Sequence, residues 1–469
     1  MSRTEMLPTT NALKALQPFH GCSRLRGNFR QGEKMKKNYN AVIIGSGIIG
    51  CSIAFELSKK GWKTLNIDKL QSAGQGSTAN TCAVIRVHYS TLDGTAVAYE
   101  SYQYWNDWAN YLRVEDPNGY ARFIQRGVLV FKSPANDYLK KVLSMLDELG
   151  IGYENWNFKK IKQKFPILDD TSYYPPRRPH DPEFGKPNEA PLTGAIYYPE
   201  GGYISDPVLS VHNVQVAAEA HGAEFQFNRT VADILKENNR IYGIALEDDD
   251  IIETPVVINA AGPYSFVINE MAGVIDGMNI KTRALRHEVI HLPAPAGVDY
   301  EAIGCPSSDS DVGAYWRPEV GNHILSGSED PECDPKEWIR NPDEFNRNLT
   351  EQARAQAYRL SLRIPDLRIP NQIQGVVDLY DVADDWIPIY DKSDLPGFYM
   401  AVGTSGNQYK NAPVVGKMMA ELILKCESGH DHDRDPLMFH LEHINRDVNL
   451  KFYSRLREIN EESSFTVLG

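Results

Sequence analysis

Three glycines and one aspartate near the start of the chain have the most informative spacing of any chemistry-bearing residues. Gly45, Gly47 and Gly50 form a complete G-x-G-x-x-G pattern, and Asp68 follows at close to the roughly 20-residue spacing of a ribose-binding carboxylate. The glycines permit a tight turn, backbone approach to a pyrophosphate and close helix–strand packing. They predict a dinucleotide site. Asp68 disfavours NADP, because a 2′-phosphate would meet its carboxylate, but it does not separate NAD from FAD.

The elements needed to position this motif surround it. The apolar run 41–44 predicts a buried strand, an apolar stripe over 49–57 predicts a helix, and 64–67 predicts a second strand that ends at Asp68. Gly61 stands where a helix C-terminus accepts a positive φ. This order puts the glycine turn between strand and helix, with the helix N-terminus facing the phosphates.

Bulk composition limits the possible partners. The chain has 469 residues, enough for two or three domains, and its net charge of −13 argues against nucleic acid or an anionic membrane as the main partner. A small anionic substrate needs only one local basic pocket. No apolar run reaches the roughly 20 residues of a membrane span. The six cysteines contain no C-x-x-C pair, so we expect a reducing compartment and no metal site.

Residues 1–38 are rich in Lys and Arg and lack the continuous apolar core of a secretory signal. Three interpretations stay open: a disordered extension, a start-site artefact with Met35 as the real start, or an organellar transit peptide. We expect a cytoplasmic protein, or a mitochondrial matrix protein if the extension is a transit peptide.

Four segments in a fixed order resemble the flavoprotein amine oxidases and dehydrogenases of the D-amino acid oxidase superfamily, nearest to the sarcosine oxidase and dimethylglycine dehydrogenase branch. They are GSGIIG with Asp68, GQGSTANTCAVIR (74–86), VINAAGPYS (257–265) and GTSGNQYKNAPVVGKMMAELI (403–423). The first is common to many families. The other three together are specific, and they imply FAD as the cofactor.

The fingerprint and the resemblance together give the predicted cofactor-binding residues. Those around the fingerprint and the end of the second strand are Gly45, Ser46, Gly47, Ile48, Ile49, Gly50, Asp68 and Lys69. Those implied by the resemblance are Gly76, Ser77, Thr78, Val231, Ala261, Gly262, Gly403, Ser405, Gly406, Asn407, Gln408 and Tyr409. The position of Val231 meets the adenine through its backbone in the family.

The resemblance also implies residues for the substrate. Arg86 and Lys410 match an arginine and a lysine that hold the substrate carboxylate, and Tyr380 matches a tyrosine lining the pocket. His88 is a further candidate because it follows Arg86 closely. From spacing alone, each also has an ordinary reading as a structural ion pair, a packed aromatic ring or a satisfied histidine.

The sequence departs from the family at four places. Asp378 stands where monomeric sarcosine oxidases attach FAD through a cysteine, and the Trp-His pair of the histidine-linked dehydrogenases is absent. We therefore expect non-covalent FAD. The oxygen-activating lysine of the oxidases has no clear counterpart. The late GHG turn is here Gly406, Asn407 and Gln408.

The expected fold class is α/β, with a Rossmann-like FAD-binding domain interleaved with an α+β substrate domain built on an antiparallel sheet. The FAD-binding domain is expected from 39–115, 195–283 and 370–428, and the substrate domain from 116–194 and 284–369. Residues 429–469 are expected to form a C-terminal tail that wraps the surface.

The resemblance implies an FAD-dependent amine or amino acid oxidase or dehydrogenase. Its substrate would be a small carboxylate-bearing amine, an N-methyl or other amino acid, which loses a hydride to the flavin and becomes an imine. Oxygen or an electron-transfer acceptor would then take the electrons. Two alternatives stay open: oxidation of a hydroxy acid or polyol phosphate, and a non-catalytic flavin-binding assembly factor.

Overall fold

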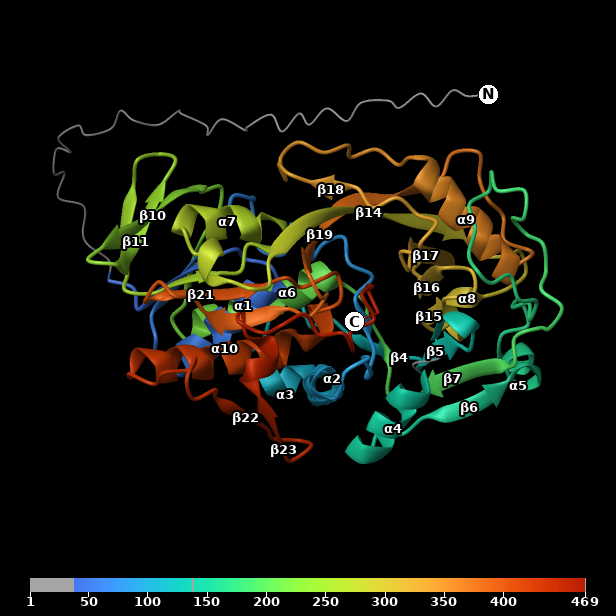
Figure 1. Ribbon diagram of the computed structural model, residues 1–469, viewed down its shortest axis with the longest axis horizontal. Coiled ribbons are helices and arrows are strands. Elements are labelled where there is room, and N and C mark those ends of the chain that lie inside the picture. The colour runs from blue at the N-terminus through green and yellow to red at the C-terminus, as the bar shows by residue number, and fades with distance from the viewer. Residues whose placement is uncertain (1–37, 137–138, 469) are drawn as a thin grey trace, which may run out of the picture. The chain divides into compact units, whose positions relative to one another are not determined.

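A computed structural model describes residues 38–136 and 139–468, which fall within one compact unit. The predicted extension therefore lies outside the described residues, apart from Asn38. Helices and sheets alternate through the chain (Figure 1), and the predicted α/β class is confirmed.

A six-stranded sheet carries the glycine motif. Four neighbouring pairings, β21–β13, β13–β1, β1–β2 and β2–β9, are parallel, and β20 joins antiparallel at one edge. In sheet order the strands are β20 (Ile389–Lys392), β21 (Phe398–Val402), β13 (Val257–Asn259), β1 (Ala41–Ile44), β2 (Thr64–Ile67) and β9 (Glu224–Gln226). Both predicted strands of the fingerprint are present.

Both faces of this sheet are covered, which explains why β1 is a continuous apolar run. Ala41 and Ile43 belong to the hydrophobic cluster that includes α1 (Ile48–Lys59), α6 (Pro207–Ala220) and α10 (Ala412–Glu427). Val42 and Ile44 point into the cluster formed with α7 (Ser265–Ala272) and the sheet of β10 (Val231–Glu237), β11 (Arg240–Leu246) and β12 (Ile251–Glu253).

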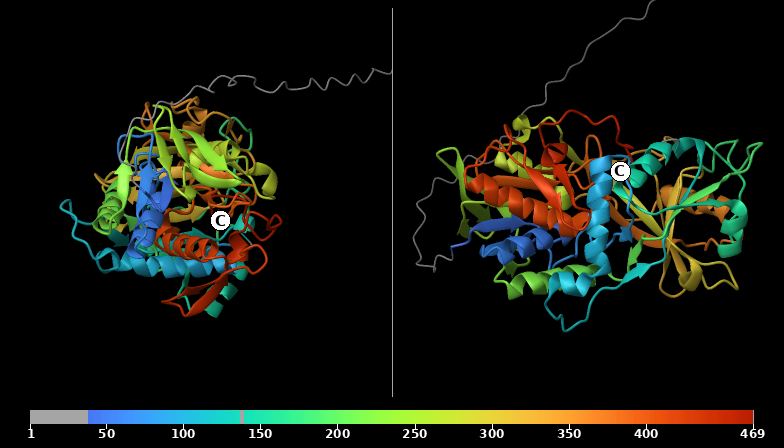
Figure 2. Two further views of the ribbon diagram at one scale, coloured as in Figure 1. Left: turned by 90° about the vertical axis from the view of Figure 1, so that its left-hand side faces the viewer. Right: turned by 90° about the horizontal axis from the view of Figure 1, so that it is seen from below.

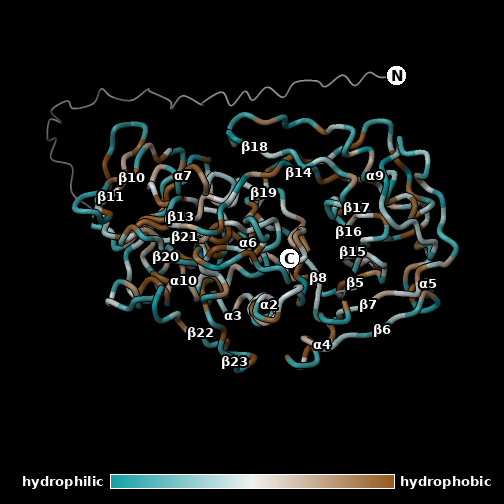
Figure 3. Tube along the Cα trace, viewed as in Figure 1, coloured by the Kyte–Doolittle hydropathy of each residue, from teal (hydrophilic) through white to brown (hydrophobic). Residues whose placement is uncertain are grey.

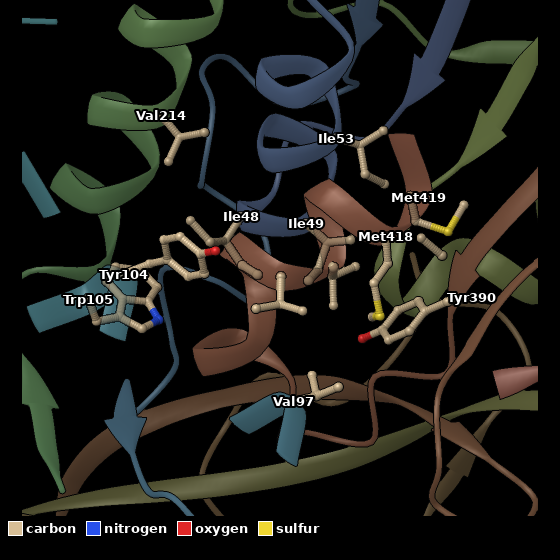
Figure 4. Packing of buried hydrophobic residues seen from close by; sticks show 14 of the residues in the cluster. Ile48, Ile49, Ile53, Val97, Tyr104, Trp105, Val214, Tyr390, Met418 and Met419 are labelled. Carbon is tan, nitrogen blue, oxygen red and sulfur yellow. The ribbon is translucent and has the colours of Figure 1, made fainter. Parts of the chain in front are cut away.

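Helix α1 is central to the first of these layers. It packs against α6 on one side and α10 on the other, and the right-hand view of Figure 2 shows the three helices side by side. Figure 4 shows Ile48, Ile49 and Ile53 of α1 in the same cluster as Val214 of α6 and Met418 of α10. This packing fixes the N-terminus of α1 at the carboxyl end of β1.

A nine-stranded, mainly antiparallel sheet forms the second large layer, and one internal pairing, β15–β5, is parallel. In order, its strands are β18 (Trp338–Ile339), β14 (Thr282–Pro293), β17 (His323–Ser328), β16 (Ala314–Glu319), β15 (Ser307–Asp309), β5 (Val128–Phe131), β7 (Gly194–Tyr198) and β6 (Glu154–Asn157), with β19 (Gln374–Ala383) also paired to β14. Helices α5 (Phe158–Lys164), α8 (Tyr300–Ile303) and α9 (Glu351–Arg363) contribute to its apolar cluster.

The long β14–β19 ladder pairs Thr282 through His291 with Ala383 through Gln374. It carries Tyr380 and Asp378 toward the six-stranded sheet. The predicted FAD-binding domain included 195–283 and 370–428, which contain most of β7 and all of β19. In the structure both strands belong to the nine-stranded sheet. The domain boundaries themselves stay a prediction.

The remaining elements connect and cover these layers. They are α2 (Leu92–Asn106), α3 (Trp108–Leu112) and α4 (Leu139–Leu149), the small sheet β3 (Val84–Ile85), β8 (Gly202–Ile204) and β4 (Phe123–Gln125), and the hairpin β22 (Met438–Leu441) and β23 (Arg446–Asn449). In Figure 3 the tube is hydrophobic along the inner strands and hydrophilic at many outer loops. No helix in the described part of the chain is long and apolar enough to span a bilayer.

The C-terminal tail has buried apolar side chains at two places. Phe439 and Leu441 are buried in the main hydrophobic cluster, and Val467 is buried in a separate cluster with Leu285 and Trp386. The tail was expected to wrap the surface, and these apolar side chains also enter the interior at both places.

Candidate active site

A cavity of about 620 Å³ opens at the carboxyl end of β1 and continues toward the nine-stranded sheet. Most of the predicted site residues line it, and the four predicted substrate residues Arg86, His88, Tyr380 and Lys410 are among them. Ser46, Gly50, Gly403 and Ser405 do not line the cavity. They support the turns whose neighbours do.

The glycine turn leaves backbone amides available at one end of the cavity. Helix α1 begins at Ile48, and its N-cap residue Gly47 provides no side-chain cap. A Cβ atom at Gly45 would overlap the carbonyl of Ala260, and one at Gly50 would overlap the carbonyl of Gly45. Only glycine allows this approach, so the amides of the first turn can face an anion.

Asp68 lies where β2 ends beside this turn. Its carboxylate accepts hydrogen bonds from the backbone N–H groups of Ser46 (2.7 Å) and Leu70 (2.9 Å). A carboxylate has lone pairs for further donors, and Asp68 lines the cavity. The arrangement fits a ribose whose hydroxyls donate to the same carboxylate.

The second motif crosses the N-terminus of α1. The backbone N–H of Ile48 donates to Thr78 Oγ1 at 3.3 Å, and Ser77 Oγ donates to the Leu379 carbonyl at 3.0 Å. Asn80 Nδ2 donates to Asp378 Oδ2 at 2.7 Å. This segment therefore links the nucleotide end of the cavity to β19, and Gly76, Ser77 and Thr78 all line the cavity.

Lys69, Tyr264 and Asp343 line the cavity and make a contact that the sequence did not reveal. Lys69 Nζ lies 2.5 Å from Asp343 Oδ1 and 4.1 Å from the ring centroid of Tyr264. The Tyr264 hydroxyl donates to the same oxygen at 2.7 Å. Val231, Ala261 and Gly262 also line the cavity.

Arg86 and Lys410 meet at the other end of the cavity. Their cationic groups each lie 4.4 Å from the centroid of the buried Tyr89 ring, measured from Arg86 Cζ and from Lys410 Nζ. Arg86 donates to the carbonyls of His88 (2.5 Å) and Val467 (3.2 Å), and Lys410 donates to the carbonyl of Asn407 (2.5 Å). The fold thus brings together two cations that are far apart in sequence.

Burial and repulsion between nearby positive charges lower the pKa values of Lys410 and His88. Burial, followed by the charge of Arg86, holds the pKa of Lys410 well below its usual range. Burial and the charges of Arg86 and Lys410 likewise hold the pKa of His88 well below its usual range. His88 is therefore a neutral ring, stacked on Tyr198 with centroids 4.2 Å apart. An anion bound here would favour the charged form of Lys410.

Tyr380 belongs to an aromatic wall that the sequence predicted only in part. Its hydroxyl lies 3.3 Å from the Tyr315 hydroxyl, and its ring stacks on His287 with centroids 3.9 Å apart. Burial raises the pKa of both tyrosines, so both hydroxyls stay protonated. Tyr315 and His287 were not predicted, because only the strand register of β14 and β16 places them here.

The late glycine turn is held by a buried carboxylate that was also missed. Asp381 accepts hydrogen bonds from the Gly403 N–H (2.6 Å) and the Ser265 hydroxyl (2.7 Å). Burial raises the pKa of Asp381 to about 7. Gly406 has a φ of +69°, and a Cβ atom there would overlap the Tyr380 ring. The turn can therefore pass closely over the aromatic wall.

Residues 40–422 match the family of FAD dependent oxidoreductases. The chain belongs to this family. The prediction of the D-amino acid oxidase superfamily is confirmed, and with it FAD as the cofactor and an oxidoreductase as the class of enzyme.

Individual relatives are similar at low identity. Glycerol 3-phosphate dehydrogenase of Caloramator mitchellensis is 25% identical over 82% of this chain and 74% of the relative. Sarcosine oxidase subunit beta of Rhodobacter capsulatus is 23% identical over 83% of this chain and 86% of the relative. The crystal structure of L-proline dehydrogenase from P. horikoshii has a TM-score of 0.69 at 24% identity, covering 84% of this chain and 95% of its own. That likeness shows the shared fold.

The cavity of this oxidoreductase fits FAD on its own evidence. A pyrophosphate requires available backbone amides and close backbone approach, and the uncapped N-terminus of α1 and the glycine turn provide both. A ribose requires an acceptor for its hydroxyls, and the carboxylate at the end of β2 provides it. When bound, FAD supplies acceptance of a hydride. Among the described residues, no group of three or more His, Cys, Asp or Glu side chains is arranged to hold a metal ion.

We expect Asp68→Asn to weaken FAD binding without unfolding the protein. The amide oxygen can still accept from Ser46, but a ribose hydroxyl loses a charged acceptor, which is worth about 1–2 kcal/mol, or roughly 5- to 30-fold in Kd. Flavin absorbance after dialysis measures the occupancy. Asp276→Asn, which changes the same charge at an exposed position, is the control. Equal occupancy in both variants would remove Asp68 from the cofactor site.

We also expect acid precipitation to release the flavin into the supernatant. Asp378 lines the cavity at the position where a cysteine link would stand, and a carboxylate bound by Asn80 is no thiol nucleophile. The visible spectrum of the washed pellet is the measurement. A yellow pellet would contradict this expectation, and mass spectrometry of the flavin-bearing peptide would then identify the attachment residue.

Proposed function

We propose that this oxidoreductase oxidises the C–N bond of a small carboxylate-bearing amine, an N-methyl or other amino acid, to an imine. The observation that carries the proposal is the convergence of Arg86 and Lys410 on the ring of Tyr89 inside the cavity. Two cations in a desolvated pocket favour an anion, and Arg86 in particular suits a carboxylate. The name of the sarcosine oxidase relative agrees with an amino acid substrate.

The same charges assist the reaction. A carboxylate held by Arg86 and Lys410 fixes which C–H bond of the substrate faces the flavin. Positive charge close to the substrate also lowers the pKa of its ammonium group, which favours the neutral amine whose lone pair stabilises the developing imine. His88 is neutral and therefore adds no third charge that would have to be compensated.

The aromatic wall limits the size and polarity of the substrate. Tyr315 and Tyr380 present protonated hydroxyls, and the planes of Tyr380 and His287 are nearly parallel. Such a wall suits a short or cyclic apolar group beside the reacting carbon. It also restricts water around the amine, which keeps the electrostatic effects strong.

A second candidate has its own support. A polyol phosphate is also an anion that Arg86 and Lys410 could hold, and one relative is named glycerol 3-phosphate dehydrogenase. The third possibility is a flavin-binding assembly factor without turnover. The three differ in what the purified protein oxidises.

A substrate panel separates them. We expect turnover with at least one of sarcosine, N,N-dimethylglycine, glycine and L-proline, and none with glycerol 3-phosphate or lactate. Rates are measured in parallel by reduction of an artificial dye and by oxygen uptake, which also shows which acceptor the enzyme uses. Turnover confined to glycerol 3-phosphate would favour the second candidate, and a flavin that no compound reduces would favour the third.

We expect Arg86→Ala to lower kcat/KM by about 10- to 200-fold, because a charge-assisted hydrogen bond contributes roughly 1.5–3 kcal/mol. Arg86→Lys should recover only part, since an ammonium lacks the planar fork. A double-mutant cycle with Lys410→Met should be non-additive, because both cations serve one anion. Arg122→Ala, at an exposed position, is the matched control.

Esterified substrates provide the sharper version of this measurement. With the wild-type enzyme, kcat/KM for the methyl ester should be lower than for the acid by a similar factor. With Arg86→Ala, esterification should lower kcat/KM little further, because the substrate charge and its partner Arg86 are then both absent. If the ester reacts with the wild-type enzyme as well as the acid does, the carboxylate is not the anchor and the proposed role of Arg86 is wrong.

A further inference from the structure

The last described residues of the chain enter the cavity beside Arg86. Val467 and Leu468 line the cavity, although they follow the predicted FAD-binding segments by about forty residues. In Figure 1 the red C-terminal segment lies near the middle of the picture, close to the elements of the site. Neither the fingerprint nor the proposed function accounts for this segment.

The approach to the cavity is firmly anchored. Arg457 is buried and binds both oxygens of the buried Asp385, with Nε and Nη2 at 2.8 and 2.7 Å, and Nη2 also donates to the Ile387 carbonyl at 2.6 Å. Arg455 is held in the same way by Asp391 and Asp433. These charge-assisted bonds fix the backbone up to Arg457.

The tip is held by weaker contacts. Phe465 and Val467 pack with Leu285, Trp386 and Tyr380. The ion pair between Glu462 and Lys141 has both side chains largely exposed, so it contributes little. Within the turn from Ser463 to Leu468, the hydrogen bonds are short-range side-chain contacts such as Ser464 Oγ with Thr466 Oγ1 at 3.1 Å.

The tip of the tail contacts the site at Arg86, the cation to which the proposed function assigns the substrate carboxylate. Arg86 Nη2 donates to the Val467 carbonyl at 3.2 Å. A carboxylate is a stronger acceptor for a guanidinium than a neutral carbonyl. A substrate carboxylate reaching Arg86 therefore competes with Val467 for the same donor.

We propose that residues 463–468 form a gate over the substrate end of the cavity, and that the substrate opens it by replacing the Val467 carbonyl on Arg86. The inference rests on the proposed function, because it requires Arg86 to bind the substrate anion. Opening exposes Phe465 and Val467 to water, which is unfavourable, so only a fraction of the molecules is open at any time. The apparent affinity for the substrate is reduced by this fraction. Closure excludes water from the empty site.

The first test measures acetate binding to the FAD-loaded enzyme from the perturbation of flavin absorbance. A variant that ends at Glu462 should bind acetate at least about tenfold more tightly than the full chain, because no gate has to open. Phe465→Ala should shift the Kd in the same direction by a smaller factor, and it tests the same point if the shortened chain folds poorly. Leu456→Ala, exposed in the anchored part of the tail, is the control and should leave the Kd unchanged.

The second measurement is amide hydrogen exchange of the full chain with and without saturating acetate. Exchange in 463–468 should become faster when acetate binds, while the peptide that contains Arg455 and Arg457 should not change. Unchanged or slower exchange in 463–468, or acetate affinity that is equal or weaker in both Glu462-terminated and Phe465→Ala enzymes, would overturn the gate.

A parallel titration of Arg86→Ala keeps this failure separate from that of the proposed function. If Arg86→Ala loses acetate binding while the tail variants behave like the full chain, the anion site stands and the gate is wrong. If Arg86→Ala binds acetate as the wild type does, the anion is held elsewhere, and both the proposed role of Arg86 and the gate are wrong.

Discussion

At the carboxyl end of β1, stretches of backbone approach so closely that a Cβ atom has no space. Gly45 lies against the Ala260 carbonyl, and Gly50 lies against the carbonyl of Gly45. Because of these contacts, α1 starts directly above β1 and the turn after β13 closes beside it. A larger residue at either glycine would move α1 away from the sheet. This approach sets the positions of the backbone amides in the first turn of α1, of Asp68 and of the layer of α6 and α10.

The opposite end of the cavity is governed by charge. Keeping Arg86 and Lys410 away from water is costly unless an anion compensates them. The fold offers only neutral acceptors in the contacts described for Lys410, the Asn407 carbonyl and the Tyr89 ring, and burial with Arg86 lowers its pKa. An anion bound beside Lys410 would compensate its charge, and the proposed function rests on this. The proposed carboxylate substrate therefore depends on the positions that the fold gives to these two side chains.

The sequence allowed the nucleotide half of the site to be predicted, because its signal is local. Strand, turn, helix and carboxylate follow one another from Ala41 to Asp68, and each obeys its own short-range rule. Tyr315, His287 and Asp381 were missed, since only the register of long antiparallel strands brings them to the cavity. The buried Val467 was missed for a similar reason, because nothing near it in sequence reports the cluster that covers it.

The departure from the family at the late turn leaves the position of Lys410 unchanged for a physical reason. The turn consists of Gly406, Asn407 and Gln408. Lys410 is positioned by a hydrogen bond to the backbone carbonyl of Asn407, and the Tyr89 hydroxyl donates to the same carbonyl at 2.7 Å. A backbone carbonyl keeps its place when the side chain changes, provided that the turn keeps its conformation. Gly406 maintains that conformation through its positive φ and its contact with Tyr380. The side chains of Asn407 and Gln408 bond mainly to one another and to Tyr89, Tyr390 and Asn411. Substitution there can therefore alter the roof of the pocket while the two cations stay in position.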